Sequence, residues 1–296
     1  MAAIELQGVT KTYGKARGVA DIDLAVEDGE VFGYLGPNGA GKTTTIRLIL
    51  DFIRPTSGTV RVLGRSPKEP ELRHQIGYLA GELDLYEKLS GEDLLTYLDS
   101  LRGNGALGYA RELAERLKLD LSRPIGKLSK GNKQKVGVVQ ALMHKPKLLV
   151  LDEPTSGLDP LVQEEFYAML ADHTAKGGSV FLSSHVLSEV ERVASRVAII
   201  REGRLAEVAS LADLRRKTVR SFEVTFDEDI APSDFETVAG LSQVSVTERI
   251  LTCQVTGAVD PFVKAIARHK VANIVSQGDD LEALFLHYYR GGGDAA

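Results

Sequence analysis

One short segment constrains this chain more than any other: residues 36–43 read Gly-Pro-Asn-Gly-Ala-Gly-Lys-Thr. The segment matches the pattern G-x-x-x-x-G-K-[ST] and lies between an apolar stretch, Val31–Leu35, and a stretch with helical spacing, Thr43–Ile53. Glycines let backbone N–H groups crowd around phosphate oxygens, and the helix that follows adds its positive end. A strand, a glycine-rich loop and a helix in this order predict a phosphate-binding α/β core.

The residue types in this loop supply the first candidate site residues. We expect the Lys42 side chain to reach the terminal phosphates of a nucleotide and the Thr43 hydroxyl to coordinate Mg²⁺. The loop backbone and the start of the helix add further phosphate-binding candidates: Gly36, Pro37, Asn38, Gly39, Ala40, Gly41 and Thr44. The loop therefore predicts a nucleoside triphosphate and Mg²⁺ as ligands. By itself it is compatible with GTPases, kinases, helicases and transport ATPases.

A second segment supplies the acidic residues that such a site needs. The apolar stretch Leu148–Leu151 reads as a buried strand, and Asp152 and Glu153 follow it directly. Asp152 is placed to hold Mg²⁺, and Glu153 is placed to polarise the attacking water as a general base. Strands often end in acidic turn residues, so Asp152 and Glu153 alone do not predict a catalytic pair. They do so here because the chain also contains a phosphate loop.

Strands and helices alternate along most of the chain. Residues 1–62 read mainly as strands with period-two apolar spacing, residues 91–119 as helix, and residues 148–200 as alternating strands and helices. Such alternation is typical of α/β proteins with a mostly parallel sheet covered by helices. Period-two spacing restarts at Phe222, so we expect two domains, residues 1–218 and 219–296. The second reads as a small βββαβα-like α+β domain whose last helix covers Leu281–Arg290.

Composition excludes several classes of protein. The 296 residues are 43% hydrophobic and 26% charged, with a formal net charge of −5, as in an average soluble globular protein. The longest apolar runs are only a few residues, far fewer than the roughly 20 of a spanning helix. The N-terminus lacks the apolar segment of a signal peptide. The single cysteine, Cys253, favours a reducing, cytosolic compartment. The excess of acidic over basic residues disfavours nucleic acid as a partner.

Four further features resemble those of ABC ATPases and occur in that family's order and spacing. Residues 128–135, Leu-Ser-Lys-Gly-Asn-Lys-Gln-Lys, resemble the signature motif LSGGQ, and residues 156–160, Ser-Gly-Leu-Asp-Pro, resemble the D-loop. His185 sits where that family has its switch histidine, and Tyr13 where it has an aromatic A-loop residue. The resemblance covers about residues 3–215.

This resemblance implies a P-loop NTPase core of the ABC type. Such a core has an antiparallel β subdomain and a helical subdomain, here at about residues 83–135. The ligands are then ATP and Mg²⁺. Tyr13 stacks on the adenine, and His185 contacts the γ-phosphate and holds the transition-state geometry with Glu153.

The resemblance also implies a head-to-tail dimer that encloses two ATP molecules. Since the chain has one phosphate loop and one signature segment, a site is completed by a second copy or by a related ATPase subunit. In that dimer the helix N-terminus at Ser129 and Gly131 binds the γ-phosphate held by the other subunit. Asp159 links the two sites across the interface.

The sequence departs from the family pattern at two places. In the signature, Lys130 replaces the first glycine and Asn132 the glutamine. In the Q-loop, which couples ATP to the membrane partner, Gly81 takes the usual glutamine position. Glu82 is then a candidate substitute for the contact to Mg²⁺ and water, or that contact is absent.

Several of these residues also have purely structural interpretations. His185 fits a helix start without a ligand, Tyr13 fits a packed surface aromatic, and Ser129 is an N-cap residue in either case. The lysines of the signature segment fit a solvated basic face better than specific phosphate ligands: Lys130, Lys133 and Lys135.

The end of the chain points to a type of transporter. Residues 278–286, Gly-Asp-Asp-Leu-Glu-Ala-Leu-Phe-Leu, resemble the LEDVFL ending of ABC-2-type drug and antibiotic exporter ATPases. This implies the ATP-hydrolysing subunit of an exporter, driven by dimer closure and opening. Because no spanning segment is found, the transmembrane permease subunits are separate polypeptides. A position on the cytoplasmic face of the cell membrane follows.

Other function classes stay open at this point: an ABC-type ATPase outside transport, or a nucleotide-sensing regulatory module with little turnover. About 86 residues separate Lys42 from Ser129, which leaves no room for the coiled coil of DNA-repair members. Translation-type members carry two ATPase domains, and this chain has one phosphate loop. A GTPase is disfavoured because no N-K-x-D sequence occurs. ATPase activity after Glu153→Gln separates a catalytic subunit from a sensor.

Overall fold

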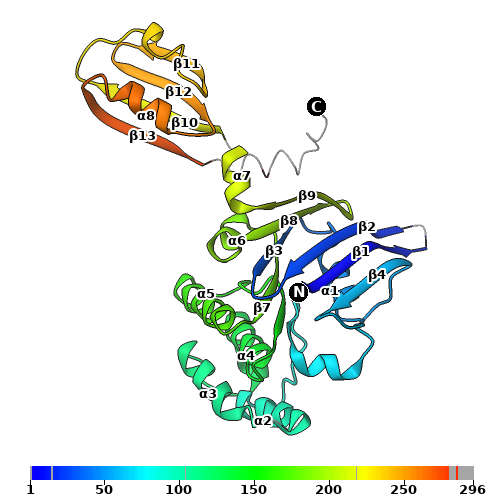
Figure 1. The fold of residues 1–296 in the computed structure, drawn as a ribbon. Coiled ribbons are helices and arrows are strands. Elements are labelled where there is room, and N and C mark those ends of the chain that lie inside the picture. Colours follow the sequence, from blue (N-terminus) through cyan, green and yellow to red (C-terminus); the bar gives the residue numbers. More distant parts are fainter. Residues whose placement is uncertain (1, 15, 104, 218, 280–284, 286–296) are drawn as a thin grey trace. The chain divides into compact units, whose positions relative to one another are not determined.

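The computed structural model describes residues 2–14, 16–103, 105–217, 219–279 and 285, and the chain forms two compact units (Figure 1). Unit 1 comprises Met1–Val208 and unit 2 comprises Ala209–Ala296. This division precedes the expected boundary near residue 218, because helix α7 (Leu211–Lys217) belongs to unit 2.

A six-stranded sheet forms the centre of unit 1, in the order β5-β6-β7-β3-β8-β9. Its strands are β3 (Val31–Leu35), β5 (Ile76–Leu79), β6 (Leu148–Asp152), β7 (Ser179–Ser184), β8 (Arg196–Arg201) and β9 (Arg204–Ser210). All pairings from β5 to β8 are parallel. Strands β3, β6 and β7 are buried along their whole length, as their apolar runs predict for a sheet covered on both faces. The expected mostly parallel sheet is confirmed.

This strand order brings the chemically important segments to one edge of the sheet. In the parallel register, Leu35 at the end of β3 pairs with Ser184, and Asp152 at the end of β6 pairs with Ser183. The phosphate loop follows β3 directly. The carboxyl ends of three adjacent strands therefore meet, although they are far apart in the sequence.

A second, antiparallel sheet covers the first helix. Its order is β2-β1-β4, formed by β1 (Ala2–Tyr13), β2 (Ala16–Glu27) and β4 (Ser57–Val62). Helix α1 (Lys42–Ile49) contacts strands of both sheets, and one core of buried side chains joins all three layers. The helix ends before the expected Ile53, because the chain turns at Asp51 with φ of 55°.

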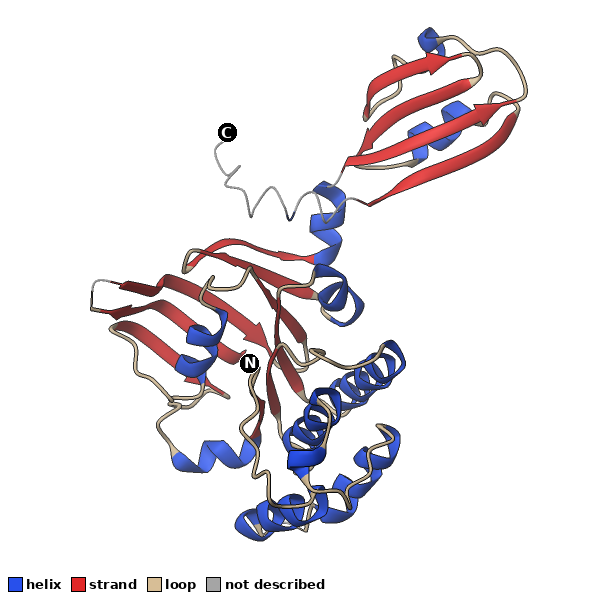
Figure 2. Cartoon of the chain, turned by 180° about the vertical axis from the view of Figure 1, so that it is seen from behind, coloured by secondary structure: helices blue, strands red, loops and turns tan. Residues whose placement is uncertain are grey.

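Helices α2 (Gly91–Arg102), α3 (Leu107–Arg116) and α4 (Lys130–Leu142) contact one another at one end of the unit (Figures 1 and 2). The expected helical stretch 91–119 is two helices, since Gly103 ends the first with φ of 67°. The remaining helical elements of unit 1 are α5 (Pro160–Ala175), α6 (Leu187–Val193), η1 (Pro70–Gln75) and η2 (Ile125–Lys127). No helix in the described ranges has the length and apolar character needed to cross a bilayer.

Unit 2 is a small α+β fold. Beyond α7 it contains the antiparallel sheet β11-β12-β10-β13 and helix α8 (Asp260–Ile266). The strands are β10 (Val219–Phe226), β11 (Leu241–Thr247), β12 (Ile250–Thr256) and β13 (Val271–Asp279), with η3 (Pro232–Asp234) after β10. Burial in its core raises the pKa of Cys253 to about 11, as befits a packed thiol. The expected helix Leu281–Arg290 falls outside the described residues except for Phe285.

Candidate functional site

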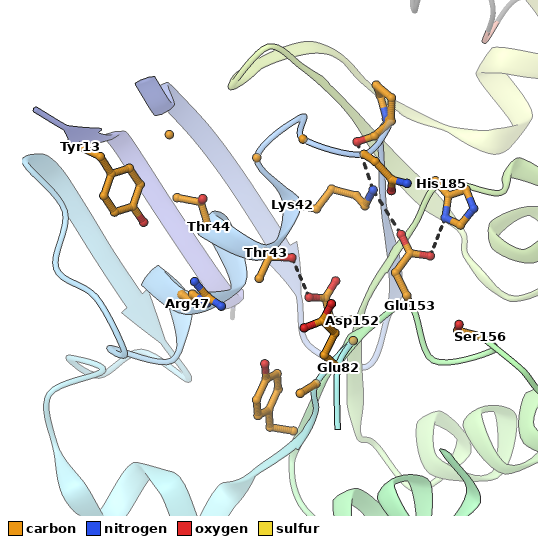
Figure 3. Close-up of a pocket in the computed structure, with 18 of the residues that line it drawn as sticks. Tyr13, Lys42, Thr43, Thr44, Arg47, Glu82, Asp152, Glu153, Ser156 and His185 are labelled. Carbon is orange, nitrogen blue, oxygen red and sulfur yellow. Dashed lines mark hydrogen bonds and ion pairs between the residues drawn. The ribbon is translucent and has the colours of Figure 1, made fainter. Parts of the chain in front are cut away.

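A cavity of about 690 Å³ lies at the edge where the parallel strands end (Figure 3). This volume is in the range of small-molecule and cofactor sites. It brings together most of the site residues predicted from the sequence: Tyr13, Pro37, Asn38, Gly39, Gly41, Lys42, Thr43, Thr44, Glu82, Asp152, Glu153 and His185.

The phosphate loop curls around the cavity because two glycines take backbone angles that L side chains avoid. Their φ values are 80° at Gly39 and 113° at Gly41. No side chain caps the N-terminus of α1, so the backbone N–H groups of its first turn are open to a ligand. Gly36 and Ala40 do not line the cavity but support the loop from behind, where the Ala40 carbonyl accepts a hydrogen bond from Gly203 N–H at 2.9 Å.

Lys42 connects the loop to the acidic side of the cavity. Its side chain is buried, and Nζ donates to the carbonyl oxygens of Gly36 at 2.6 Å and Pro37 at 3.3 Å. The same ammonium lies 3.2 Å from Oε1 of Glu153 and is the counter-ion of that buried oxygen. An anion bound in the loop would compete with Glu153 for this ammonium.

Asp152 is held in place by two hydroxyl groups. Its Oδ2 accepts a hydrogen bond from Thr43 Oγ1 at 2.9 Å, and its Oδ1 accepts one from Ser183 Oγ at 2.5 Å. Ser183 is the register partner of Asp152 on the neighbouring strand. The carboxylate is therefore fixed toward the Thr43 hydroxyl, and two oxygen ligands from distant segments lie side by side.

Glu153 and His185 form the next pair (Figure 3). Nδ1 of His185 lies 2.8 Å from Oε2 of Glu153. Glu153 has a φ of 48°, a conformation that costs energy for a residue with a side chain and persists where its surroundings fix it. Here its N–H donates to the Ser183 carbonyl at 3.1 Å, and Gln134 of α4 donates to the carbonyl of Pro154 at 2.9 Å. The turn after β6 is thus held from two sides.

Tyr13 lies at the opposite end of the cavity from His185 (Figure 3). Its side chain is 46% exposed, and Lys11 Nζ lies 5.4 Å from the ring centroid. A Cβ at Gly18 would come within 2.8 Å of the ring, so the glycine leaves room for it. An exposed aromatic ring is thus available at the end of the cavity away from the carboxylates.

The segment after β5 closes the floor of the cavity. A Cβ at Gly81 would lie 3.4 Å from the carboxylate of Asp152, and the exposed Glu82 follows on the cavity wall. Burial and the negative charge of Asp152 raise the pKa of Tyr78, while the positive charge of Arg47 opposes the shift. Glu82 therefore lies near Thr43 and Asp152. Gly81, at the position where the Q-loop usually has a glutamine, has no side chain.

Besides Gly36 and Ala40, three predicted residues do not line this cavity. Ser129 caps α4, where its Oγ accepts a hydrogen bond from the backbone N–H three residues on at 3.3 Å. Asp159 caps α5 in the same way at 3.1 Å. Gly131 packs against Gly157, and a Cβ on it would lie 2.4 Å from the Gly157 carbonyl oxygen. Within one chain, Ser129 and Asp159 begin helices, and the contact of Gly131 with Gly157 joins the signature segment to the D-loop.

Other residues line or support the site without having been predicted as site residues. Arg47, four residues after Thr43, shares its face of α1, a helical spacing that could have identified it. Ser183 lies two residues before His185, and its role depends on the strand order. Lys130, expected on a solvated face, lines the cavity. The remaining lining residues in this group are Gly18, Tyr78, Ala80 and Ser156.

The donor set suits a magnesium ion shared with a nucleotide. Mg²⁺ in such sites is held by one or two carboxylates together with phosphates and water rather than by a full cage of side chains. Thr43 Oγ1 and Asp152 Oδ2 supply adjacent hard oxygen atoms, with Glu82 on the same wall. The described residues contain no group of three or more His, Cys, Asp or Glu side chains placed to hold a metal ion alone.

Known proteins share both the sequence and the fold. The ABC transporter family matches residues 19–156. The chain is also 33% identical to the bacitracin transport ATP-binding protein BcrA of Enterococcus faecalis, over 99% of this chain and 98% of that protein. The chain belongs to the ABC transporter family. This ABC subunit is also 35% identical, over 73% of its length, to the probable multidrug ABC transporter ATP-binding protein YbhF of Escherichia coli, of which the match covers 38%.

Solved structures agree with this assignment. The ATP-binding subunit of an ABC transporter superimposes with a TM-score of 0.67 at 32% identity, over 72% of this chain and 92% of that one. A dimeric ATP-binding cassette bound to ADP and Pi has the same fold, with a TM-score of 0.65 at 23% identity, over 70% of this chain and 98% of that one. The ABC subunit described here binds and hydrolyses ATP, and the expected P-loop ABC fold is confirmed.

Proposed function

We propose that this ABC ATPase powers the export of a drug or antibiotic through separate transmembrane subunits. The similarity to a protein named for bacitracin transport extends over nearly the whole of both chains, unit 2 included. The exporter-like ending at residues 278–286 points the same way. The observation that carries the chemistry is the convergence of Lys42, Glu153 and His185 at one end of the cavity.

ATP lies along the cavity from Tyr13 to His185. The exposed Tyr13 ring stacks on the adenine, since a π-face accepts a base without directional bonds. The phosphates occupy the glycine-rich loop, where backbone N–H groups and the helix N-terminus stabilise their charge. The terminal phosphate then lies beside Lys42.

Thr43 and Asp152 would hold the magnesium ion, and Glu82 would contribute in place of the missing glutamine. The ion would supply positive charge against the phosphate oxygens. Ser183 keeps the Asp152 carboxylate aimed at the site, because it occupies the other carboxylate oxygen.

Hydrolysis follows from a change of partner at Lys42. In the structure this ammonium pairs with Glu153, and an incoming phosphate offers it a stronger anionic partner. The freed Glu153 oxygen can then accept a proton from the attacking water. His185, 2.8 Å from the other carboxylate oxygen, orients Glu153 and contacts the γ-phosphate.

The second half of each site comes from another subunit, either a second copy or a related ATPase. Ser129 and Gly131 begin α4 and present its N-terminus to the γ-phosphate of the partner. Asp159 lies at the same interface, at the start of α5. The helical subdomain, at about residues 83–135, contacts the permease at the cytoplasmic face of the cell membrane.

The test of the proposed chemistry is Glu153→Gln. We expect ATP hydrolysis by the purified chain to fall at least 100-fold, since a general base contributes about 10²–10⁴ in rate. ATP affinity, measured by calorimetry, should stay within about threefold of the parent chain, since the amide keeps the shape of the side chain and removes only its charge.

Glu164→Gln is the matched control. Glu164 pairs with Arg192 on the surface and does not line the cavity, so this variant should hydrolyse ATP at the parent rate. Full ATPase activity in Glu153→Gln would refute the catalytic assignment. Co-purification of the chain with a protein of several spanning helices would support the exporter assignment, whereas reproducible recovery without any membrane protein would count against it.

A further inference from the structure

A second cavity, of about 300 Å³, lies at the edge of the central sheet opposite the nucleotide cavity. Its lining includes Lys147 and Gly178, which directly precede strands β6 and β7, whereas the nucleotide cavity lies where these strands end. The C-terminal ends of helices α4 and α5 and Tyr109 of α3 complete the wall. The volume is at the lower limit of small-molecule sites. None of the lining residues takes part in the proposed ATP chemistry.

Three exposed lysines give this cavity a positive charge: Lys145, Lys147 and Lys176. Nζ of Lys145 lies 4.6 Å from the ring centroid of Tyr109, which also lines the cavity. In the described part of the chain, no carboxylate lies within ion-pair distance of the three ammonium groups. The C-termini of α4 and α5 contribute about half a negative charge each, so a positive charge of about two remains. The cavity therefore attracts an anion.

A buried polar atom in the wall of this cavity has no partner. The side chain of His173 is 9% exposed, and its Nε2 makes no hydrogen bond in the described structure. The ring lies against Gly178, where a Cβ would come within 2.2 Å of Nε2, and both residues line the cavity. Because an unpaired buried polar atom costs stability, a ligand that pairs with Nε2 gains affinity.

The backbone around His173 determines which kind of ligand atom Nε2 needs. Burial lowers the pKa of His173, a hydrogen bond with the Ser179 backbone opposes this shift, and the charge of Lys176 adds to it. The imidazole is therefore neutral at pH 7. Since the Ser179 N–H already donates to the Lys147 carbonyl at 2.8 Å, the ring donates to the Ser179 carbonyl. A neutral imidazole has one N–H, so Nε2 is an acceptor that needs a donor.

We propose that this cavity binds a phosphate group that carries a P–OH hydrogen, as in hydrogen phosphate or a singly protonated phosphate monoester. The charged oxygens pair with the lysines, which bind phosphate as point charges. The hydroxyl donates to Nε2 of His173, for which sulfate or a carboxylate has no hydrogen. The site is separate from the proposed ATP site, and its test does not depend on that proposal.

Lys145 offers a variant that removes charge without harming the fold. Its backbone has a φ of 51°, which glycine adopts at less cost than a residue with a side chain. Lys145→Gly should therefore be at least as stable as the parent chain in urea unfolding. Lys118, which follows α3, is also exposed and has the same φ of 51°, but it does not line the cavity. Lys118→Gly is thus the matched control.

The test follows the ring nitrogens of His173 by NMR in the full chain labelled with nitrogen-15 histidine, and His173→Gln identifies the signal. Sodium phosphate should shift the Nε2 resonance, since Nε2 gains a hydrogen bond. Lys145→Gly should raise the phosphate concentration at half-saturation about five- to tenfold, and Lys118→Gly less than about twofold. Sodium sulfate should need about tenfold higher concentrations than phosphate, because it leaves Nε2 unpaired.

Equal half-saturation by phosphate and sulfate would overturn the proposal, as would equal weakening by Lys145→Gly and Lys118→Gly. The signal belongs to His173, so phosphate bound in the loop at residues 36–43 does not imitate the expected result. Unchanged stability of Lys145→Gly excludes misfolding as the cause of weaker binding.

Sedimentation with vesicles identifies the source of the phosphate. Phosphatidic acid in phosphatidylcholine vesicles presents a phosphate monoester, whereas phosphatidylcholine alone does not. If the parent chain sediments only with phosphatidic acid and Lys145→Gly does not sediment, the ligand is a lipid headgroup. If free phosphate shifts the His173 signal and neither chain sediments, the ligand is a soluble phosphate compound. No shift with phosphate together with no sedimentation would show that the cavity binds no phosphate.

Discussion

Two parts of the ATPase site differ in how their residues are bonded. In the first, side chains from the phosphate loop, β6 and the end of β7 bond to one another: Lys42 to Glu153, Glu153 to His185, and Thr43 to Asp152. In the second, Ser129 and Asp159 bond only to the backbone of the helices they start, as far as the described contacts show. One part is assembled within the chain, and the other is a pair of helix ends.

This difference explains what each part requires. In the first part, a bound nucleotide replaces contacts between side chains of the same chain. A single chain should therefore bind ATP. The second part offers a helix N-terminus, which contributes to binding only when an anion held by another subunit lies against it. Variants in the two parts should therefore separate ATP binding from steps that need a second subunit.

The largest expected effect tests the second part. Ser129→Asp keeps a good N-cap for α4 but places a negative charge where the partner's phosphate should bind. We expect ATP hydrolysis to fall at least about 100-fold, because an oxyanion-type contact becomes a repulsion. ATP binding by monomers should be unchanged. Steady-state ATPase assays and calorimetry measure the two quantities.

Ser129→Asn is the control for this change, since asparagine caps as well as aspartate without the charge. It should retain far more activity than Ser129→Asp. Equal activity of Ser129→Asp and the parent chain would mean that the helix end meets no phosphate. Weaker ATP binding by Ser129→Asp monomers would place Ser129 in the first part of the site.

The second prediction concerns the far end of α4, where His144 lies 3.0 Å from the Ile76 carbonyl through Nε2. Burial, followed by the positive charge of Arg102, lowers the pKa of His144 from 6.5 to about 4. The unfolded chain therefore takes up a proton below pH 6.5 that the folded chain does not. Stability from this neutral histidine is complete above pH 6.5 and is lost as the pH falls toward 4, by about 2 kcal/mol at pH 5.

The check is urea unfolding at pH 7.5 and pH 5. His144→Gln, which cannot titrate, should lose about 2 kcal/mol less between these values than the parent chain. The variant should still show some pH dependence, because burial also lowers the pKa of His173. An identical loss in both proteins would show that His144 does not anchor this helix as a neutral side chain.

The third prediction tests the base end of the first part. Tyr13→Ala should raise the Kd for ATP and for ADP equally, by about tenfold, because base stacking contributes about 1–3 kcal/mol. Tyr13→Phe should bind both nearly as well as the parent, since it keeps the ring. Fluorescence titration with the two nucleotides measures this. A loss confined to ATP would contradict adenine stacking.

The smallest expected effect concerns Glu82, which lines the cavity but, unlike Asp152, makes no hydrogen bond in the described structure. Glu82→Gln should raise the Mg²⁺ concentration for half-maximal ATPase activity about threefold, because the interaction of one exposed charge is worth less than about 1 kcal/mol. Asp152→Asn should raise it much more. If Glu82→Gln leaves the Mg²⁺ requirement unchanged, the Q-loop contact is absent from this subunit.

Much of the first part of the site could be predicted from the sequence. The glycine pattern of residues 36–41 and the apolar run before Asp152 are local signals, because each depends on neighbours a few residues away. The general rule that parallel strands end at one edge then places Glu153 near the loop. The contact of Glu153 with His185 needs the order of β6 and β7, which no local pattern contains.

The second part was harder to predict for the same reason. The helix-capping role of Ser129 is local and was expected, but Lys130 facing its own cavity depends on where the D-loop passes. Gln134 holds the turn after Glu153 from a different segment, and the signature sequence gives no sign of this contact. Strand β9 was not expected at all, because residue type does not follow its burial: Glu207 takes a partly buried position and Val208 an exposed one.

The contact between Gly131 and Gly157 limits how this subunit can evolve or be engineered. Backbone meets backbone there, and even one methyl group at Gly131 would lie 2.4 Å from a carbonyl oxygen. The positions on either side, Lys130 and Asn132, already differ from the usual signature residues. The chain therefore departs from the usual signature on both sides of one point of closest backbone approach, and libraries that vary the signature should leave that glycine untouched.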